Sequence, residues 1–318
     1  MPGSGSERMP TPGSRAVTTP GTAQRTVAVV GVQTGPAGGD LDENLRAASE
    51  LARTGSPTGG LVVFPELFSR PFWCLGMSDP QYFAWAEPIT GPTIRHAAEL
   101  AVDLGSVIVA PFFERGAIAG EYFNSVAVIG PDGNLLPGRL PDDSATRLYR
   151  KNAVSAYRWG DQVNDEKFYF KPGNGFAVFD TPVGRIGILV CLDRWFPEAW
   201  RVLALRGAEV ICVVNASQGD VDDLFVPSMR TCAAQNVVFT IAVNRVGTED
   251  FAGHRSRYYG RSCVIDPAGT VLAQAGGDKP EMMAAQLDLS DVADVRARRT
   301  MYRDRRPELY RVVCEIPG

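Results

Sequence analysis

The chain has 318 residues, of which 45% are hydrophobic and 21% charged, so it can bury a large core and has an ordinary globular composition. The net charge of −4 gives no reason to expect a nucleic-acid partner. No apolar run approaches about 18 residues, which argues against a membrane-spanning helix and a membrane partner.

Six cysteines occur without CxxC pairs or metal-ligand spacing, and the chain has only two histidines. We therefore expect reduced thiols, a cytoplasmic location and no metal site. The N-terminus also lacks the apolar core of a secretory signal.

Strands and helices are expected to alternate after a disordered tail at residues 1–25, which is rich in Gly, Ser, Pro and Thr. The expected strands cover 26–32, 61–64, 106–113, 122–129, 135–140, 147–151, 175–180, 185–190, 209–215, 237–244, 261–266, 271–274 and 284–289. The expected helices cover 41–53, 92–104, 198–206 and 221–235. This order indicates an α/β fold with mixed sheets covered by helices, in one domain over residues 26–290. Residues 291–318 would then form a polar C-terminal arm.

A polar and aromatic loop is expected at Asn152–Pro172. It is longer than most loops in compact domains, and such loops often bind ligands. It contains Trp159 and Glu166.

Cys191 lies where a buried strand, Arg185–Val190, gives way to a helix that Pro197 and Glu198 are suited to begin. Side chains at the carboxyl edge of a sheet are placed for function in α/β proteins. A thiol near a helix N-terminus can also have a lowered pKa and act as a nucleophile. A packed core cysteine is the alternative interpretation.

Two more charged residues end apolar strands. Glu66 follows the strand at 61–64, and Lys151 closes the strand at 147–151. A carboxylate beside a buried strand is costly unless it is paired or functional. The alternative for Glu66 is a solvated position at the rim of the sheet.

The contexts FPELF, YRK and CLDRWFPE together resemble the nitrilase superfamily of carbon–nitrogen hydrolases. The family pattern is a glutamate, a lysine and a cysteine in that order, and Glu66, Lys151 and Cys191 match it. A second family glutamate precedes a YF-x-PG segment, and Glu166 in EKFYFKPG matches that position. The resemblance implies a four-layer αββα sandwich. It also implies a homodimer or larger homo-oligomer, with residues 291–318 at the interface between subunits.

Within the superfamily, EKFYFKPG, CLDRWFPEAWR and YRDRRPELY are similar to segments of N-carbamoylputrescine amidases and N-carbamoyl-amino-acid amidohydrolases. The family lysine is often followed by a His-hydrophobic-Pro run, whereas 152–155 reads Asn-Ala-Val-Ser. That loop borders the active site in the family. The departure therefore leaves the identity of the substrate undecided, but it does not change the expected reaction class.

The resemblance implies cysteine-dependent hydrolysis of a C–N bond, without metal or cofactor, in an N-carbamoyl amine or N-carbamoyl amino acid. Glu66 would take the proton of Cys191, which attacks the carbonyl carbon. Lys151 and the N–H of Leu192 would stabilise the oxyanion. Glu166 would orient Lys151 or the substrate, unless it is a surface glutamate of the loop.

Three further residues are candidates for substrate binding. Arg194 could pair with a substrate carboxylate, or alternatively with Asp193 or Glu198. Trp159 and Trp195 could form walls of the pocket or belong to the plain core. The alternative activities are an amidase for a small primary amide that bears an amino or guanidino group, then a nitrilase, an acyl transferase and a non-catalytic scaffold.

Overall fold

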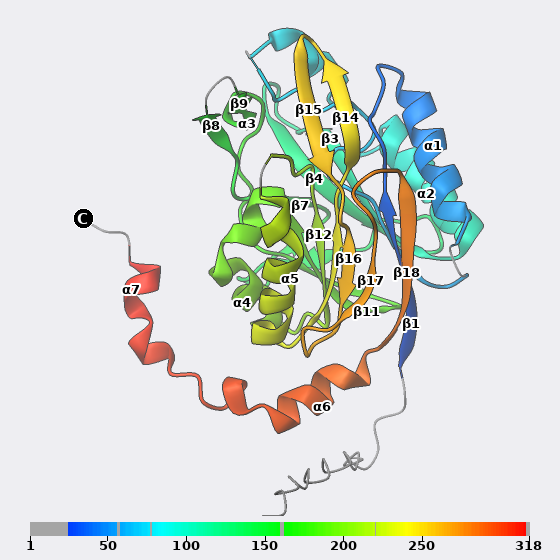
Figure 1. Cartoon of the computed structure of the whole chain (residues 1–318). Helices are drawn as coiled ribbons and strands as arrows, with labels where there is room; N and C mark the ends of the chain where they lie inside the picture. The colour runs from blue at the N-terminus through cyan, green and yellow to red at the C-terminus, as the bar shows by residue number, and fades with distance from the viewer. Residues whose placement is uncertain (1–24, 56–57, 77, 160–161, 220, 316–318) are drawn as a thin grey trace, which may run out of the picture.

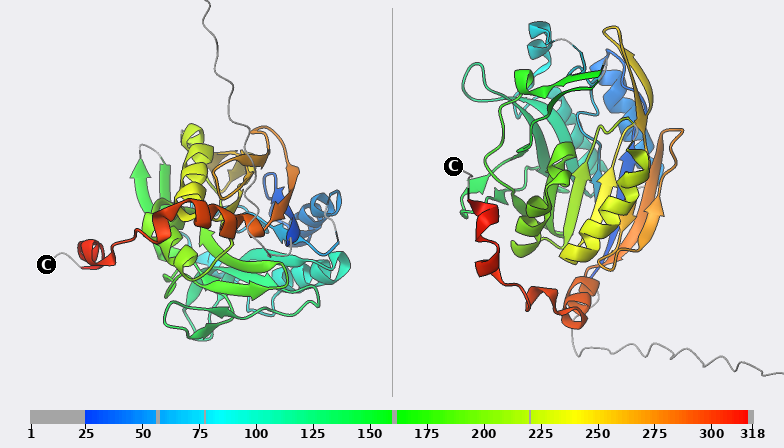
Figure 2. Two further views of the ribbon diagram at one scale, coloured as in Figure 1. Left: turned by 90° about the horizontal axis from the view of Figure 1, so that it is seen from below. Right: turned by 60° about the vertical axis from the view of Figure 1, so that its left-hand side comes forward.

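Two β-sheets pack face to face and carry helices on their outer sides (Figures 1 and 2). This computed structural model describes residues 25–315 except 56–57, 77, 160–161 and 220. The expected four-layer αββα sandwich is confirmed. The expected disordered tail lies, apart from Arg25, outside the described residues.

The first sheet has a parallel centre and antiparallel edges. Its order is β18 (Glu281–Asp288), β1 (Thr26–Gln33), β2 (Leu61–Val63), β3 (Val107–Arg115), β4 (Tyr122–Ile129) and β7 (Tyr149–Arg150). Strands β1, β2 and β3 run parallel. Glu66 follows β2 and Lys151 follows β7, so this sheet supplies two of the candidate site residues.

The second sheet is built in the same way. Its order is β17 (Val271–Gln274), β16 (Cys263–Ile265), β13 (Phe239–Val243), β12 (Val210–Val214), β11 (Gly184–Val190), β10 (Val178–Thr181), β5 (Gly138–Arg139) and β6 (Ala145–Thr146). Strands β11, β12 and β13 are parallel. Their carboxyl ends therefore meet at one edge, where Cys191 follows β11 and Asn215 follows β12.

Alternating side chains separate the layers of the core. On β11, Ile188 and Val190 point between the two sheets, and Leu189 packs under the outer helices. The outer helices are α1 (Leu41–Arg53) and α2 (Pro92–Leu104) on the first sheet, and α4 (Pro197–Leu205) and α5 (Asp222–Asn236) on the second. The sandwich thus holds the strand ends of both sheets in fixed positions around the candidate site.

Two ribbons were not expected from the sequence. The expected loop 152–172 contains the ribbon β8 (Ala156–Trp159) and β9 (Gln162–Asp165) and the short helix α3 (Glu166–Tyr169). A second ribbon, β14 (Val246–Phe251) and β15 (His254–Tyr259), follows β13. Both are rich in polar residues and were missed because they carry no clear alternation of apolar residues. Two short 3₁₀ helices are η1 (Pro80–Trp85) and η2 (Cys191–Trp195), and the second begins at the candidate cysteine.

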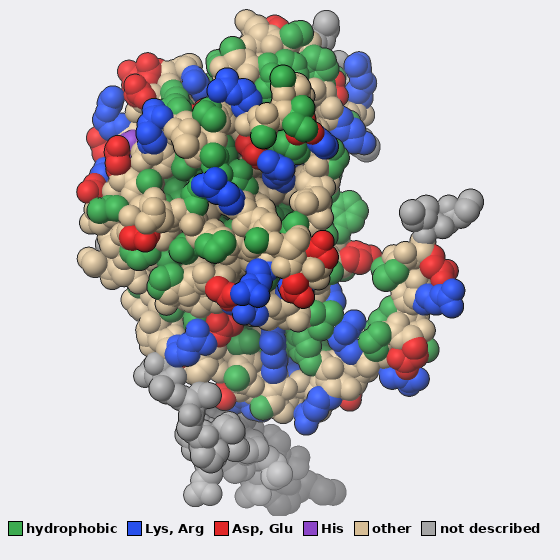
Figure 3. Space-filling view, turned by 180° about the vertical axis from the view of Figure 1, so that it is seen from behind, with side chains coloured by type: hydrophobic (Ala, Val, Ile, Leu, Met, Phe, Trp, Pro, Cys, Tyr) green, Lys and Arg blue, Asp and Glu red, His purple; other side chains and the backbone are tan. Residues whose placement is uncertain are grey.

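The C-terminal arm begins with α6 (Ser290–Arg298), whose Val292 and Val295 are buried against the body. After η3 (Thr300–Tyr302) it leads through η4 (Pro307–Leu309) to α7 (Arg311–Cys314). Figure 3 shows this last part standing clear of the body with hydrophobic side chains on its surface. Leu309 is 62% exposed and Val312 is 74% exposed.

None of the helices in the described ranges is long and apolar enough to cross a membrane. All six cysteines are free thiols. Among the same described residues, no group of three or more His, Cys, Asp or Glu side chains is placed to hold a metal ion.

Candidate active site

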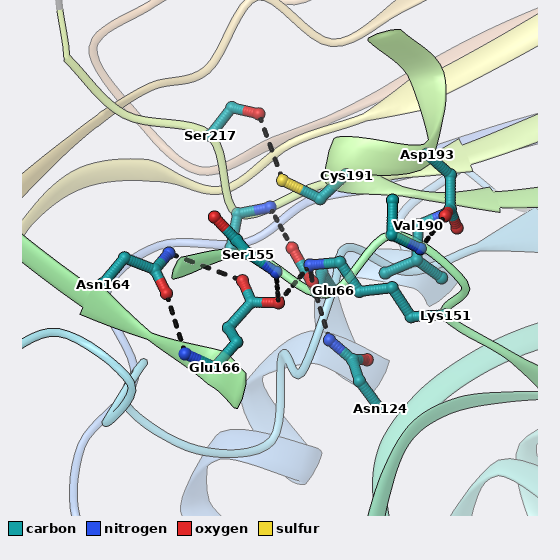
Figure 4. Close-up of polar contacts among 12 residues, drawn as sticks. Glu66, Asn124, Lys151, Ser155, Asn164, Glu166, Val190, Cys191, Asp193 and Ser217 are labelled. Carbon is teal, nitrogen blue, oxygen red and sulfur yellow. Dashed lines mark hydrogen bonds and ion pairs between the residues drawn. The ribbon is translucent and has the colours of Figure 1, made fainter. Parts of the chain in front are cut away.

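Three of the expected residues meet in a buried ion cluster (Figure 4). Nζ of Lys151 lies 2.9 Å from Oε1 of Glu66 and 2.7 Å from Oε2 of Glu166. Each of the three side chains is at most 1% exposed. The rim position for Glu66 and the surface position for Glu166 are therefore both wrong.

The carboxylate of Glu66 is held from both sheets. Its Oε1 accepts a hydrogen bond from Nδ2 of Asn124 at 2.7 Å, and its Oε2 accepts one from the backbone N–H of Ala216 at 3.0 Å. The backbone carbonyl of Asn124 also accepts the N–H of Lys151 at 2.9 Å. Asn124 thus fixes both members of the pair, although its place inside β4 gave no signal in the sequence.

Glu166 is fixed at the start of α3. Asn164 accepts the N–H of Glu166 at 3.1 Å, and the N–H of Ser155 donates to Oε2 of Glu166 at 3.3 Å. Burial raises the pKa of Glu166. Burial would lower the pKa of Lys151, but the charges of Glu166 and Glu66 outweigh it and raise that pKa well above its usual value. The lysine therefore stays cationic.

The strand that ends at Lys151 is locked by close backbone contacts. The carbonyl of Lys151 accepts the N–H of Gly173 at 2.8 Å. A Cβ on Gly173 would lie 2.2 Å from the carbonyl oxygen of Arg150, so only glycine fits there. This explains the glycine of the EKFYFKPG segment, which closes the loop over the lysine.

Cys191 has a strained backbone at the end of β11. Its φ of +47° is left-handed, which costs a non-glycine residue about 1–3 kcal/mol. Asp193 holds this turn by accepting the N–H of Val190 at 3.0 Å, the hydroxyl of Tyr149 at 2.6 Å and the N–H of Ala153 at 2.8 Å. The strain thus belongs to a turn that is fixed from three sides, and its thiol lies near enough to the cluster for the charges of Glu66 and Lys151 to act on it.

The thiol is neutral at rest. Burial, and then the charge of Glu66, raise the pKa of Cys191 to about 12, although Lys151 and Arg194 act in the opposite direction. The expectation of a lowered thiol pKa is therefore wrong. The reason is that burial of the sulfur and the negative charge of Glu66 outweigh the positive charges of Lys151 and Arg194.

A pocket of about 130 Å³ lies over the thiol. Leu192, Arg194 and Trp195 line it together with Cys191 and Glu166. Trp195 is 48% exposed and stands at its edge, so it is not part of the core. Trp159 ends β8, and its side chain lies outside the described part of the structure.

Arg194 is 6% exposed, yet it forms no ion pair with any described carboxylate. The pairing with Asp193 or Glu198 is therefore not observed, because the oxygens of Asp193 are taken by the turn. The guanidinium lies 4.7 Å from the ring of Trp195. Its Nη2 contacts Oγ of Ser217 at 3.4 Å, and that hydroxyl lies 3.8 Å from Sγ of Cys191.

A second buried arginine, which the sequence did not suggest, fixes the segment after Glu66. Arg245 is fully buried, and its guanidinium donates to the carbonyls of Glu66 at 3.1 Å and Arg70 at 2.8 Å. It also donates to the carbonyl of Leu67, whose φ of +48° is left-handed. Glu249 pairs with Arg245 at 3.1 Å. A charged residue two positions after the buried strand β13 is the only sequence signal for this clamp, and it does not identify the partners of that residue.

Comparison with known proteins identifies the family that this geometry belongs to. A family model described as carbon-nitrogen hydrolase matches residues 26–297. The chain belongs to the carbon–nitrogen hydrolase family. This member of the nitrilase superfamily is therefore a hydrolase that acts on carbon–nitrogen bonds other than peptide bonds.

The matches to similar proteins cover nearly the whole length of this hydrolase. N-carbamoylputrescine amidase of Solanum tuberosum is 35% identical over 293 residues, which cover 88% of this chain and 92% of that protein. Citrullinase of Francisella tularensis is 32% identical, over 84% of this chain and 91% of that protein. The crystal structure of a carbon-nitrogen hydrolase from Helicobacter pylori G27 has 29% identity and a TM-score of 0.80, over 92% of this chain and 99% of that one.

Proposed function

We propose that this hydrolase uses Cys191 to remove the carbamoyl group of a small N-carbamoyl amino acid. The observation that supports an acidic substrate is Arg194, a buried cation beside the thiol without a carboxylate partner among the described residues. A substrate carboxylate would supply that partner through charge-assisted hydrogen bonds.

The first half of the reaction makes a covalent intermediate. Glu66 accepts the proton of Cys191 as the sulfur attacks the carbamoyl carbon, which suits a thiol that is neutral at rest. Lys151, held cationic by Glu66 and Glu166, faces the developing oxyanion, and the N–H of Leu192 is the second donor. Glu66 then returns the proton to the departing nitrogen, and ammonia leaves.

The second half releases the substrate remnant. Glu66 activates a water molecule, which attacks the thioester and displaces the thiolate, and Cys191 regains its proton. The product is a carbamic acid, which loses CO₂ to give the free amino acid. Because ammonia leaves first, the acid end stays bound to Arg194 and the intermediate keeps its position throughout.

The charge of the pocket separates the possible carbamoyl substrates. The amidase named for N-carbamoylputrescine is a relative, but the free ammonium of such a substrate would meet Arg194. Citrulline, the compound in the name of another relative, has an ammonium and a carboxylate at the end opposite its ureido group, so a carboxylate is available to pair with the arginine. The arginine therefore favours ureido acids over ureido amines.

A primary amide is the second candidate, because the same thiol and ion cluster could cleave it and a relative is named omega-amidase. The test measures ammonia release from N-carbamoylglycine, citrulline, N-carbamoylputrescine, glutaramate and a short nitrile. We expect the ureido acids to have the highest kcat/KM. Faster turnover of glutaramate would favour the amidase.

Two variants test the roles of the residues. Cys191→Ala should abolish ammonia release, and full activity would contradict the nucleophile. Arg194→Gln should raise KM for N-carbamoylglycine by about 10- to 100-fold and leave the neutral N-propylurea unchanged, as expected for the loss of a charged hydrogen bond. Equal effects on both compounds would remove Arg194 from carboxylate binding.

We also propose that the arm at 291–318 packs on a second copy of the chain. Its exposed apolar side chains, among them Leu309 and Val312, support this. Truncation after Arg303 should shift the mass in analytical ultracentrifugation toward the monomer. A full-length chain that sediments as a monomer would contradict the proposal.

The six free cysteines support a reducing compartment, and we propose the cytoplasm. Labelling of thiols directly after cell lysis should find all six reduced. Disulfide-linked material would contradict this location.

A further inference from the structure

A second and larger hollow lies beside the active-site pocket. This groove has a volume of about 720 Å³, against about 130 Å³ for the pocket over Cys191. Its walls are one face of the β14–β15 ribbon, the end of β17 with the segment 275–278 that follows it, and Gln218, Gly219 and Asp222 before and at the start of α5. The segment after β17 meets the base of the ribbon, where the N–H of Arg261 donates to the carbonyl of Gly276 at 3.0 Å. Its size is that of a ligand site rather than a surface crevice.

The groove is joined to the active site by two side chains. Gln218 lines both the groove and the pocket over the thiol. Tyr259 lines the groove, and its hydroxyl lies 3.5 Å from Nη2 of Arg194. The same Nη2 contacts Ser217, which is the neighbour of the thiol. Arg194 therefore stands between the sulfur and the groove.

Positive charge follows the groove away from Arg194. Arg255, Arg257 and Tyr259 alternate along β15, so they share one face of the strand, about 6.8 Å apart from one to the next. Arg257 forms no ion pair with a described residue, and opposite it on β14 stands the neutral Thr248.

The other charges of the groove are largely compensated. Arg261 pairs with Asp222 at 2.9 Å, and Arg255 is 3.8 Å from Asp250, which stands opposite it in the ribbon. The remaining carboxylate is that of Asp278, in the segment after β17. Arg257 is thus the cation of the groove that lacks a counter-charge.

We infer that this groove is a second anion-binding subsite, which takes a second acidic group of the substrate. The inference rests on the proposed function, because it assumes that the first carboxylate is bound at Arg194. The substrate class is then a ureido diacid, with its carbamoyl carbon at Cys191 and its side-chain carboxylate or phosphate in the groove. Arg257 is the residue that determines this specificity.

The test compares substrates that differ only in the side-chain charge. N-carbamoylglutamate and N-carbamoylaminoadipate carry the second carboxylate, and N-carbamoylnorvaline has a neutral side chain of similar length. Arg257→Gln should raise KM for the two diacids about tenfold and leave kcat unchanged. KM for N-carbamoylnorvaline should change by less than about twofold. Arg46→Gln, the same change on the exposed face of α1 on the other sheet, serves as the matched control and should change nothing.

Binding to Cys191→Ala, measured by isothermal titration, separates the inference from the proposed function. The inference of a second subsite is supported if Cys191→Ala binds the diacid more tightly than N-carbamoylnorvaline and if adding Arg257→Gln to this variant removes the difference. This result does not depend on whether the wild type hydrolyses ureido acids. If the wild type hydrolyses both compounds but Arg257→Gln weakens the binding of neither, or of both equally, the inference of a second subsite fails while the proposed function still holds.

Inorganic phosphate distinguishes a substrate group from a free anion. As a mimic of the second acidic group, phosphate should compete with N-carbamoylglutamate and leave the norvaline compound unaffected. If phosphate binding depends on Arg257 but inhibits neither compound, the groove serves a separate anion and the inference of a substrate subsite fails.

Discussion

Nζ of Lys151 lies 2.9 Å from Oε1 of Glu66, and neither side chain is more than 1% exposed. With Glu166 at 2.7 Å, one buried ammonium faces two carboxylates. Removing a partner from such a cluster leaves charge without compensation, which is far more costly than the loss of a surface pair. The cluster that we assign to catalysis is therefore also a determinant of stability.

Replacement of Lys151 by Met should lower the free energy of unfolding by about 3–5 kcal/mol near neutral pH, because Glu66 and Glu166 lose their counter-charge. The loss should be smaller at mildly acidic pH, because burial raises the pKa of Glu166 and this carboxylate then takes up a proton more readily. Urea denaturation at both pH values measures it. Lys171→Met, which removes an exposed pair with Glu121, should cost less than about 1 kcal/mol, and an equal cost would contradict the buried cluster.

Glu66→Gln should make the thiol more acidic and the enzyme slower. The charge of Glu66 helps to raise the pKa of Cys191 to about 12, so its removal lowers that pKa. Turnover should still fall by about 10²- to 10⁴-fold, because the proton acceptor is lost. The pH dependence of iodoacetamide labelling reports the thiol, with Cys191→Ala as background. A thiol as weakly acidic as in the wild type would argue against contact with Glu66.

Buried thiols should make the protein less stable in alkali. Cys263 is fully buried, which raises its thiol pKa to about 12, against about 8.5 when unfolded. Between these values the unfolded chain has lost a proton that the folded chain keeps, so stability falls with pH by up to about 1.4 kcal/mol per unit. In Cys263→Ala the slope between about pH 9 and 11 should be less steep by that amount. Cys314→Ala, at an exposed position, should leave the slope unchanged.

Arg245→Lys should keep the buried charge opposite Glu249 but lose the fork that holds Glu66, Leu67 and Arg70. A shift of the base by about 1 Å can cost about 10²-fold, so kcat should fall while KM changes little. The pH profile of kcat separates this positioning role from simple unfolding. Arg185→Lys, in an exposed pair with Asp180, is the matched control, and an unchanged kcat in Arg245→Lys would refute the clamp.

The sequence was most informative where side chains end apolar strands. Glu66, Lys151 and Cys191 could be found in this way, because the carboxyl ends of parallel strands meet at one edge. Asn124 and Arg245 could not, since their roles depend on the pairing of strands that are distant in the chain. The direction of the thiol pKa was also inaccessible, because it is set by what surrounds the sulfur in three dimensions.

The β14–β15 ribbon has two faces with different neighbours. Glu249 and Tyr258 point inward to the clamp on Arg245, whereas Thr248 and Arg257 line the groove. Because alternate positions of one ribbon hold these two groups, selection could exchange the outward residues and change which compounds are accepted while the chemistry stays intact. Homologues that differ at the outward positions and keep the inward ones are expected to catalyse the same reaction on different substrates. Mutant libraries for altered substrate selectivity are therefore best confined to the outward face of the ribbon.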